Sequence, residues 1–298
     1  MTTDADSTSN PTNPLSPERF QLHWTRRDFE QRLGFRGGRF TSFNKTLALL
    51  IAALLTAVFY GAIILIVRQC PQTRWFTAMF MERGICPYPT MFFFFWAVAI
   101  LFLKERKLSL QTAALDLLAV PQQPDFVLTP QSARTVLDRI HALVDSTSHF
   151  ILLNRVERAL SNLHNMGNVS DVSQILKTQA EYDEEQMASS YTLVQGLAWA
   201  IPVLGFIGTV LGLSQAIAAF GGALQTGSDF ALLKGSLQAV TAGLATAFET
   251  TLVALVAALV IQLRSTILQA RESEFLDACN DYCHANIVAK LRLREPTN

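Results

Sequence analysis

Four stretches of this chain are apolar over a length that suits a membrane-spanning helix. About 20 residues, at a rise of about 1.5 Å each, cross the hydrocarbon layer of a bilayer. The stretches cover residues 47–67, 85–103, 199–220 and 239–263. The second contains the shortest uninterrupted run, MFFFFWAVAILFL, and reaches full length only when the segment around Pro87 contributes its first turn. The pattern predicts an all-α membrane protein with four transmembrane helices.

A long polar segment with helical periodicity separates the second and third stretches. Between residues 130 and 163, apolar residues recur mainly three and four positions apart, which is typical of one long amphipathic helix. Thr129 is a suitable cap for a helix that begins at Pro130. The sequence HNMGN at 164–168 interrupts the pattern, and a further helix is expected from about Ser170 into the third apolar stretch. The segment therefore predicts a helical cytoplasmic domain.

These patterns divide the chain into five parts. Residues 1–45 are expected to form a disordered, basic N-terminal segment, 46–103 two peripheral transmembrane helices with a loop at 68–86, 104–192 the cytoplasmic domain, 193–264 the other two transmembrane helices, and 265–298 a C-terminal helix. Lys and Arg residues gather before the first span and after the second, which indicates the cytoplasmic side, so four spans place both termini in the cytoplasm. A polar tail, rather than a short basic leader, precedes the first span, which is expected to remain as an anchor.

Composition excludes several classes of function. Of the 298 residues, 50% are hydrophobic and 16% are charged, which is too apolar for an ordinary soluble enzyme of this size. The formal net charge of zero gives no indication of the strongly basic surface that nucleic-acid-binding proteins usually carry. The sequence contains no nucleotide-binding glycine loop, no zinc-ligand spacing and no nucleophile paired with a base. We therefore expect a protein that is not an enzyme and holds no metal or cofactor.

Three smaller clusters admit more than one interpretation. Cys70 and Cys86 flank the loop between the first two spans, where an oxidising compartment favours a disulfide worth about 3 kcal/mol; the alternative is two free thiols. Cys279 and Cys283 lie one helical turn apart but lack a further ligand at suitable spacing, which favours a packed helix face over a metal site. The acidic run EYDEEQ at 181–186 either collects cations at the inner mouth of a pathway or forms the solvated side of a helix.

The third span carries a row of small residues. Gly205, Gly208 and Gly212 are three and four positions apart, so they share a thin face where a neighbouring helix can approach closely. Pro202 cannot donate a backbone hydrogen bond and leaves the carbonyl of Ala198 free. The proline is therefore either a tolerated kink or a flexing point.

Thr209 and Thr251 are polar residues deep in the third and fourth spans. Thr209 lies roughly 16 Å from the inner end of its helix, and Thr251 lies at a similar depth in a helix that runs the opposite way. Their hydroxyl groups can therefore share one level of the membrane. A lone threonine in a span usually bonds the carbonyl four residues back, whereas two at one depth offer oxygen ligands to a passing cation.

Glu249 places a carboxylate inside the fourth apolar stretch. A charged, unpaired acid there costs several kcal/mol, so we expect it to be protonated, hydrogen-bonded or in contact with water. Helical geometry turns it about 200° away from Thr251, onto the side of Thr246 and Thr250. It either serves an ion pathway or, as a protonated acid, bonds Thr246 or Thr250 at a contact between subunits.

Two motifs give the sequence a resemblance to a known family. The segment IPVLGFIGTVLGLSQAI resembles the Pro-x-x-Gly-x-x-Gly-Thr-x-x-Gly span of the MotA/TolQ/ExbB ion-channel family. The segment GLATAFETTLVALVAAL resembles the final span of that family. Both motifs occur in the family's order, and together they cover roughly residues 190–265.

The resemblance implies a subunit of an ion-driven motor. Family members form homopentamers in the bacterial inner membrane around a dimer of a single-span MotB/ExbD/TolR-like protein, which supplies the ion-accepting aspartate. The third and fourth spans would then form the pore, with Thr209 and Thr251 at the family's pathway threonines and Thr246, Glu249 and Thr250 beside them. Flow of protons or sodium through the assembly would drive mechanical work.

Two features depart from the family pattern. Relatives of the TolQ and ExbB branches carry a glutamate where this chain has Thr246, and the acid here follows three residues later at Glu249. Two spans before the cytoplasmic domain resemble the MotA branch, whereas the threonine motifs resemble TolQ and ExbB, so the branch stays open. The alternative function is a non-conducting four-helix membrane scaffold or sensor, whose polar residues only join helices.

Overall fold

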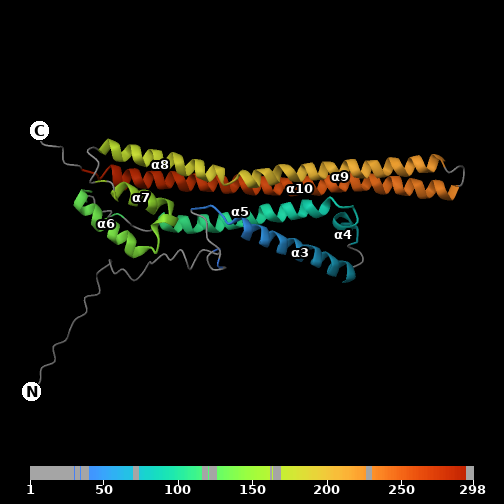
Figure 1. Cartoon of the computed structure of the whole chain (residues 1–298), viewed down its shortest axis with the longest axis horizontal. Coiled ribbons are helices and arrows are strands. Elements are labelled where there is room, and N and C mark those ends of the chain that lie inside the picture. The colour runs from blue at the N-terminus through green and yellow to red at the C-terminus, as the bar shows by residue number, and fades with distance from the viewer. Residues whose placement is uncertain are drawn as a thin grey trace, which may run out of the picture. The chain divides into compact units, whose positions relative to one another are not determined.

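The computed structural model describes residues 30, 34, 40–69, 74–115, 120, 126–161, 163, 169–225 and 230–292. Its longer helices are α3 (Lys45–Gln69), α4 (Arg74–Met81), α5 (Pro87–Leu115), α6 (Pro130–Leu143), α7 (Ile151–Ser161), α8 (Val169–Ser189), α9 (Thr192–Gln225) and α10 (Phe230–Cys283) (Figure 1). A 3₁₀ turn, η2 (Thr147–His149), precedes α7, and a π-helical turn, η4 (His284–Val288), follows α10. Within these ranges the chain is almost entirely helical, which confirms the all-α prediction.

Four helical segments are long and apolar enough to cross a membrane. They are α3, α5, Val169–Gly222 and Lys234–Val288. Each contains one of the predicted apolar stretches, so the prediction of four such helices is confirmed. The boundaries differ, because α5 continues twelve residues past the predicted end at 103 and α10 continues to Cys283 without a break at 265. The polar sequences after both apolar runs are rich in helix-forming residues, so nothing in them ends the helix.

The single helix predicted over 130–163 is wrong, because α6 and α7 are separate helices. The Thr129 cap is confirmed: its side chain accepts a hydrogen bond from Ser132 N, and Thr129 N donates back to Ser132 Oγ at 2.8 Å. At the other end, Val144 and Phe150 have extended backbone on either side of η2. The sequence DSTS between them supplies side chains that bond locally and compete with helical hydrogen bonds, and this interrupts an otherwise helical pattern.

The chain divides into two compact units, of which the first contains residues 110–179 and 279–298. Its core includes buried side chains from α6, α7 and η4, namely Val136, Ile140, Val156, Leu160 and Ile287. Gln111 is fully buried and joins the start of α7 to the turn before it, because its amide donates to His149 O at 2.6 Å and accepts from Ile151 N at 3.0 Å. Such a buried side chain with both partners satisfied fixes the position of the turn.

A carboxylate connects α6, η2 and α7 in this first unit. Burial disfavours the charged form of Glu157, but hydrogen bonds from Thr147 and His141 outweigh that effect and hold its pKa below the usual carboxyl value. Because the folded-state pKa is lowered, the stabilisation is present above the unfolded pKa of about 4.3 and is lost as the pH falls through the folded value.

We therefore expect acid to loosen the contact of α6 with α7. Hydrogen exchange of the α6 and α7 amides should speed up as the pH is lowered below the range of free carboxyl groups, after correction for the intrinsic rate. Glu157→Gln should remove most of this pH dependence and lower local stability at neutral pH by about 1 kcal/mol. The exposed Asp138→Asn serves as the control. If Glu157→Gln and Asp138→Asn show the same pH dependence of exchange, the effect arises from groups other than Glu157.

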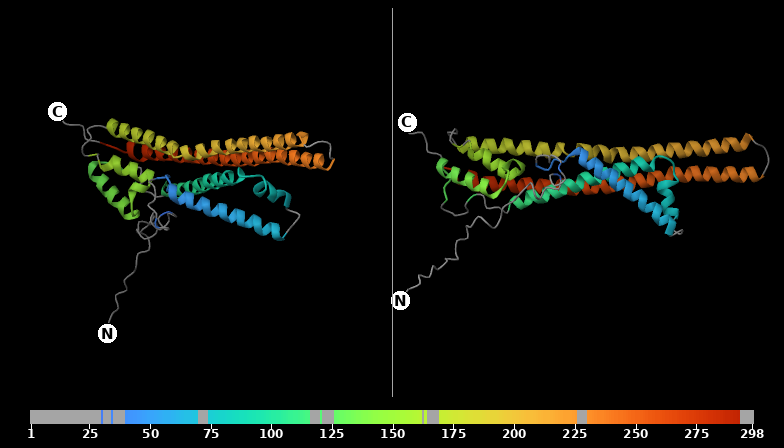
Figure 2. Two further views of the ribbon diagram at one scale, coloured as in Figure 1. Left: turned by 45° about the vertical axis from the view of Figure 1, so that its right-hand side comes forward. Right: turned by 60° about the horizontal axis from the view of Figure 1, so that its bottom comes forward.

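The second unit contains residues 28–109 and 180–278. Within it, α9 and α10 lie side by side along their lengths (Figures 1 and 2). A hydrophobic cluster of Ile63, Met79, Phe80 and Met91 joins α3, α4 and α5, and Val253 of α10 packs against it. This cluster therefore marks the side of α10 that faces α3, α4 and α5.

A buried ion pair attaches the segment before α3 to α5. Lys107 Nζ lies 2.6 Å from Glu30 Oε2 and donates to the carbonyl of Ser42, while Asn44 N donates to Glu30 Oε1 at 2.9 Å. Glu30 and Thr41 are buried. Most of the predicted disordered segment 1–45 lies outside the described residues, but its described end is packed against the rest of the unit.

Candidate functional site

Three of the glycines of α9 face α10 at very short range, namely Gly205, Gly208 and Gly212. A Cβ on Gly208 would stand 2.3 Å from Thr250 Oγ1, and a Cβ on Gly212 would stand 2.6 Å from the carbonyl oxygen of Gly243. At Gly205 the nearest atom would be Ala254 Cβ, also at 2.6 Å. No real Cβ makes contacts this short, so the approach of the two backbones depends on glycine. The structure thus packs the row of small residues that the sequence singles out in the third span against the fourth span.

A hydroxyl group bridges the two helices within this contact. Thr251 Oγ1 donates to the carbonyl oxygen of Gly205 at 3.0 Å and has a second acceptor in Ala247 O at 3.2 Å. Thr209 lies one turn further along α9 and donates to Phe206 O of its own helix at 2.6 Å. The two threonines therefore occupy neighbouring turns of the helix pair. Among the described residues, no hydrogen bond joins their hydroxyl groups directly.

Glu249 forms an ion pair with a residue from the loop between the first two spans. Arg83 Nε lies 2.7 Å from Glu249 Oε2 and Arg83 Nη2 lies 3.0 Å from Oε1, so the guanidinium contacts both carboxylate oxygens. The two side chains are 21% and 19% exposed. A bidentate pair of this kind is among the stronger charge-assisted contacts. The charge that looked isolated in the sequence is therefore compensated by a distant arginine.

Within the described residues of this one chain, no hydrogen bond joins Glu249 to Thr246 or Thr250, and a bond of this kind at a contact between subunits stays a prediction. Thr246 Oγ1 donates to Ala242 O at 3.0 Å, and Thr250 Oγ1 donates to Thr246 O at 2.8 Å. A helical threonine satisfies its hydroxyl on a carbonyl of the preceding turn, whereas a guanidinium offers the carboxylate a charged partner. Glu249 is one turn before Val253, which packs against the α3–α4–α5 cluster, so it faces that side of α10 rather than the Gly205 contact.

Pro202 and the cysteines that the sequence singles out take no part in the Glu249 ion pair. α9 is continuous through Pro202, so the proline does not end the helix. Cys86 is buried, and Cys70 lies outside the described residues, so their pairing stays a prediction. Cys279 and Cys283 are both buried on α10, as a packed helix face requires.

The sequence analysis did not predict a buried cluster of charged residues at the junction between α8 and α9. Lys104 Nζ lies 3.0 Å from Glu272 Oε1, donates to Ser190 Oγ at 2.7 Å and stands 4.2 Å from the centre of the Tyr191 ring. Ser190 and Tyr191 are the two residues between α8 and α9. A lysine directly after an apolar span is usually interpreted as a residue at the cytoplasmic surface of the membrane. The sequence therefore does not indicate that Lys104 is buried.

The comparison with protein families finds a similarity over this helix pair. Residues 147–280, a little under half of the chain, match the MotA/TolQ/ExbB proton channel family. No curated protein and no solved structure matched the chain. The matched range includes all of α9 and nearly all of α10, with Thr209, Thr251 and the glycine contact. With its four apolar helices, this is a multi-pass membrane protein whose residues 147–280 resemble the MotA/TolQ/ExbB proton channel family.

Proposed function

We propose that this chain is the pore-forming subunit of an ion-driven motor in a bacterial inner membrane. The proposal is that it conducts protons or sodium together with a single-span partner and converts the flux into mechanical work. The observation that carries it is the position of the family match, which covers the α9–α10 pair where two backbones meet through glycine and a threonine hydroxyl reaches across. In this arrangement both termini are cytoplasmic, and α3 and α5 are the peripheral spans.

The ion pathway follows the side of α9 and α10 that carries Thr209 and Thr251. Both side chains are partly exposed, and each hydroxyl donates to a backbone carbonyl. Hydroxyl oxygens bind cations weakly enough to release them, which conduction requires. Glu249 has a different role, because Arg83 occupies both its carboxylate oxygens. We assign that pair to holding the outer loop against α10.

Exposed apolar faces on α9 and α10 support assembly with further chains. Phe206 of α9 and Phe248 of α10 are 65% and 67% exposed, and both helices carry further exposed large apolar residues along their lengths. In a membrane such faces contact lipid or other helices, and small-residue faces favour helix association. We propose a homopentamer around a dimer of a MotB/ExbD/TolR-like protein, whose span supplies the ion-accepting aspartate.

Native mass spectrometry of the purified complex tests this proposal. The chain is expressed with the product of its neighbouring gene, only the chain carries an affinity tag, and the complex is released from detergent in the spectrometer. The expected mass corresponds to five copies of this chain and two copies of a protein with one span and an aspartate near its start. A monomeric chain that retains no single-span protein would contradict the proposal and favour a scaffold or sensor.

A further inference from the structure

A small recess lies between α5 and α10, close to the point where the apolar run of each helix ends. Its lining residues are Leu101 and Glu105 of α5, with Arg264, Ile267, Leu268 and Arg271 of α10. The apolar runs end at residues 103 and 263, so the recess begins at the surface of the membrane. Its enclosed volume is about 10 Å³, the space of one water-sized group, so a larger ligand would lie over its mouth.

Two arginines of α10 share the single carboxylate of this lining. Arg264 Nη2 donates to Glu105 Oε2 at 2.8 Å, and Arg271 Nη1 donates to Glu105 Oε1 at 3.2 Å. Both arginine side chains are 58% exposed, and that of Glu105 is 35% exposed. Two positive charges therefore meet one negative charge, which leaves the lining with a net positive charge.

Most hydrogen-bond donors of Arg264 and Arg271 are left for another partner. A guanidinium group carries five N–H donors, and within the described residues each of these groups uses one of them on Glu105. An exposed ion pair contributes little stability, so the two arginines can turn toward a ligand at small cost. Because the planar fork of arginine matches the oxygen atoms of a phosphate, the recess suits a phosphate group.

An apolar stripe leads from these arginines into the membrane. Val256 and Val260 lie two turns and one turn before Arg264 and are 53% and 42% exposed. Ile267, between the two arginines, is 47% exposed. Spacings of three and four residues place these side chains and both arginines on one side of α10. A ligand that joins a phosphate to hydrocarbon chains matches both parts of this surface, and in a bilayer that ligand is a phospholipid.

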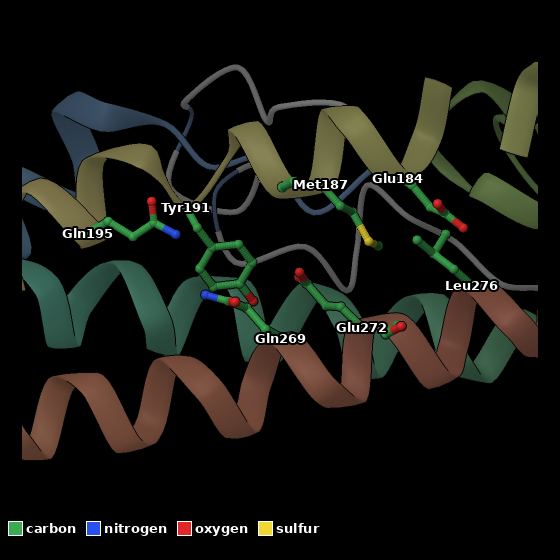
Figure 3. Close-up of a pocket in the computed structure, with 9 residues that line it drawn as sticks. Glu184, Met187, Tyr191, Gln195, Gln269, Glu272 and Leu276 are labelled. Atoms are coloured by element: carbon green, nitrogen blue, oxygen red, sulfur yellow. The ribbon is translucent and has the colours of Figure 1, made fainter. Parts of the chain in front are cut away.

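The neighbouring Lys104 does not contribute its charge to the recess. It precedes Glu105 on α5, but it is fully buried and its Nζ lies 3.0 Å from Glu272 Oε1. Glu272 belongs to the wall of a separate cavity between the α8–α9 junction and α10 (Figure 3). That cavity shares no lining residue with the recess. An anion at the recess is therefore held by Arg264 and Arg271.

We propose that this recess binds the phosphodiester group of an anionic phospholipid. One phosphate oxygen enters the recess, the free N–H groups of Arg264 and Arg271 bind the others, and an acyl chain lies along Val256 and Val260. Glu105 keeps the two guanidinium groups together, and the net positive charge selects a lipid of net negative charge. The bound lipid attaches α5 to α10 at the membrane surface. The inference goes beyond the proposed function, because it needs no ion conduction.

Native mass spectrometry of the delipidated full chain in detergent tests the site. Phosphatidylglycerol is the probe, phosphatidylcholine with the same acyl chains is the comparison, and the dissociation constant of the first bound lipid is measured. Phosphatidylglycerol should bind the unmodified chain more tightly than phosphatidylcholine does. Arg264→Gln and Arg271→Gln should each weaken phosphatidylglycerol binding about tenfold, because each removes a charge-assisted contact with phosphate. Both arginines are exposed, so neither substitution disturbs the core.

Arg106→Gln is the matched control. Arg106 follows Glu105 on α5 and is exposed, but it does not line the recess, and its guanidinium lies 5.3 Å from the centre of the Phe102 ring. The substitution removes the same charge near the same level of the membrane, so it should leave the dissociation constant nearly unchanged. Equal losses from Arg264→Gln and Arg106→Gln, or equal binding of the two lipids to the unmodified chain, would overturn the inference.

Two further measurements separate a lipid site from general attraction of anions. Arg264→Lys keeps the charge and loses the planar fork, so it should also weaken phosphatidylglycerol binding. Binding as tight as that of the unmodified chain would show that charge alone acts there, which would contradict a built site. Inorganic phosphate at the concentration of the lipid should not displace it, because inorganic phosphate has no chain to contact Val256 and Val260. Displacement would assign the recess to a soluble anion instead of a lipid.

Discussion

Gly212→Ala is expected to separate α9 from α10 and to destabilise the protein by more than about 2 kcal/mol. The new methyl group would stand 2.6 Å from Gly243 O and 2.7 Å from Ala247 N, and both are backbone atoms that cannot rotate away. Inserting even one carbon into a packed contact typically costs about 1–3 kcal/mol of stability. We expect a loss in the upper part of this range, because the two backbones themselves must move apart. Thermal unfolding in detergent, followed by circular dichroism, measures the effect.

Gly221→Ala provides a matched control on the same helix. A Cβ at Gly221 meets no atom within 4 Å, so this substitution adds the same methyl group without a contact to disturb. It should leave the midpoint unchanged or raise it slightly, since alanine is the better helix former. If Gly212→Ala and Gly221→Ala unfold at the same temperature, the two helices do not meet as described.

Arg83→Ala is expected to lower the free energy of unfolding by about 3 kcal/mol. The substitution leaves Glu249 largely buried in an apolar span without its charged partner, and removing one member of such a pair costs more than removing both. The combined variant Arg83→Ala/Glu249→Gln should therefore recover much of the loss. A double-mutant cycle on unfolding midpoints measures the coupling.

The control for this pair is an arginine near the same loop. Arg68 lies at the end of α3 and is exposed, so Arg68→Ala should change the unfolding midpoint little. A coupling close to zero, with Arg83→Ala no more harmful than Arg68→Ala, would show that Glu249 does not depend on Arg83.

Features set by local spacing could be predicted from the sequence. The apolar runs predict the four candidate spans, and the spacing of Gly205, Gly208 and Gly212 predicts the face that meets α10. Thr129 before Pro130 predicts a helix start because capping involves only neighbouring residues. Each of these conclusions needs only the geometry of one helix.

Features that depend on distant partners could not be predicted. Arg83 and Glu249 are 166 positions apart, and no periodicity connects a loop arginine to an acid in the last span. The same holds for Lys104 and Glu272, whose pairing requires α5 and α10 to pack together. The break between α6 and α7 could not be predicted for another reason. The apolar residues on both sides of DSTS keep a helical spacing, and the local hydrogen bonds that interrupt the helix there do not change that spacing.

Ion uptake into vesicles tests most directly whether α9 and α10 line an ion pathway. The complex of this chain with its single-span partner is reconstituted, a gradient is imposed, and uptake of protons and of sodium is recorded separately. Thr209→Val/Thr251→Val removes both hydroxyls at nearly constant volume and should slow uptake by more than about tenfold. Thr241→Val on α10 removes a hydroxyl that bonds only within its own helix and should have little effect. Uptake by the double variant at the rate of Thr241→Val would contradict the pathway.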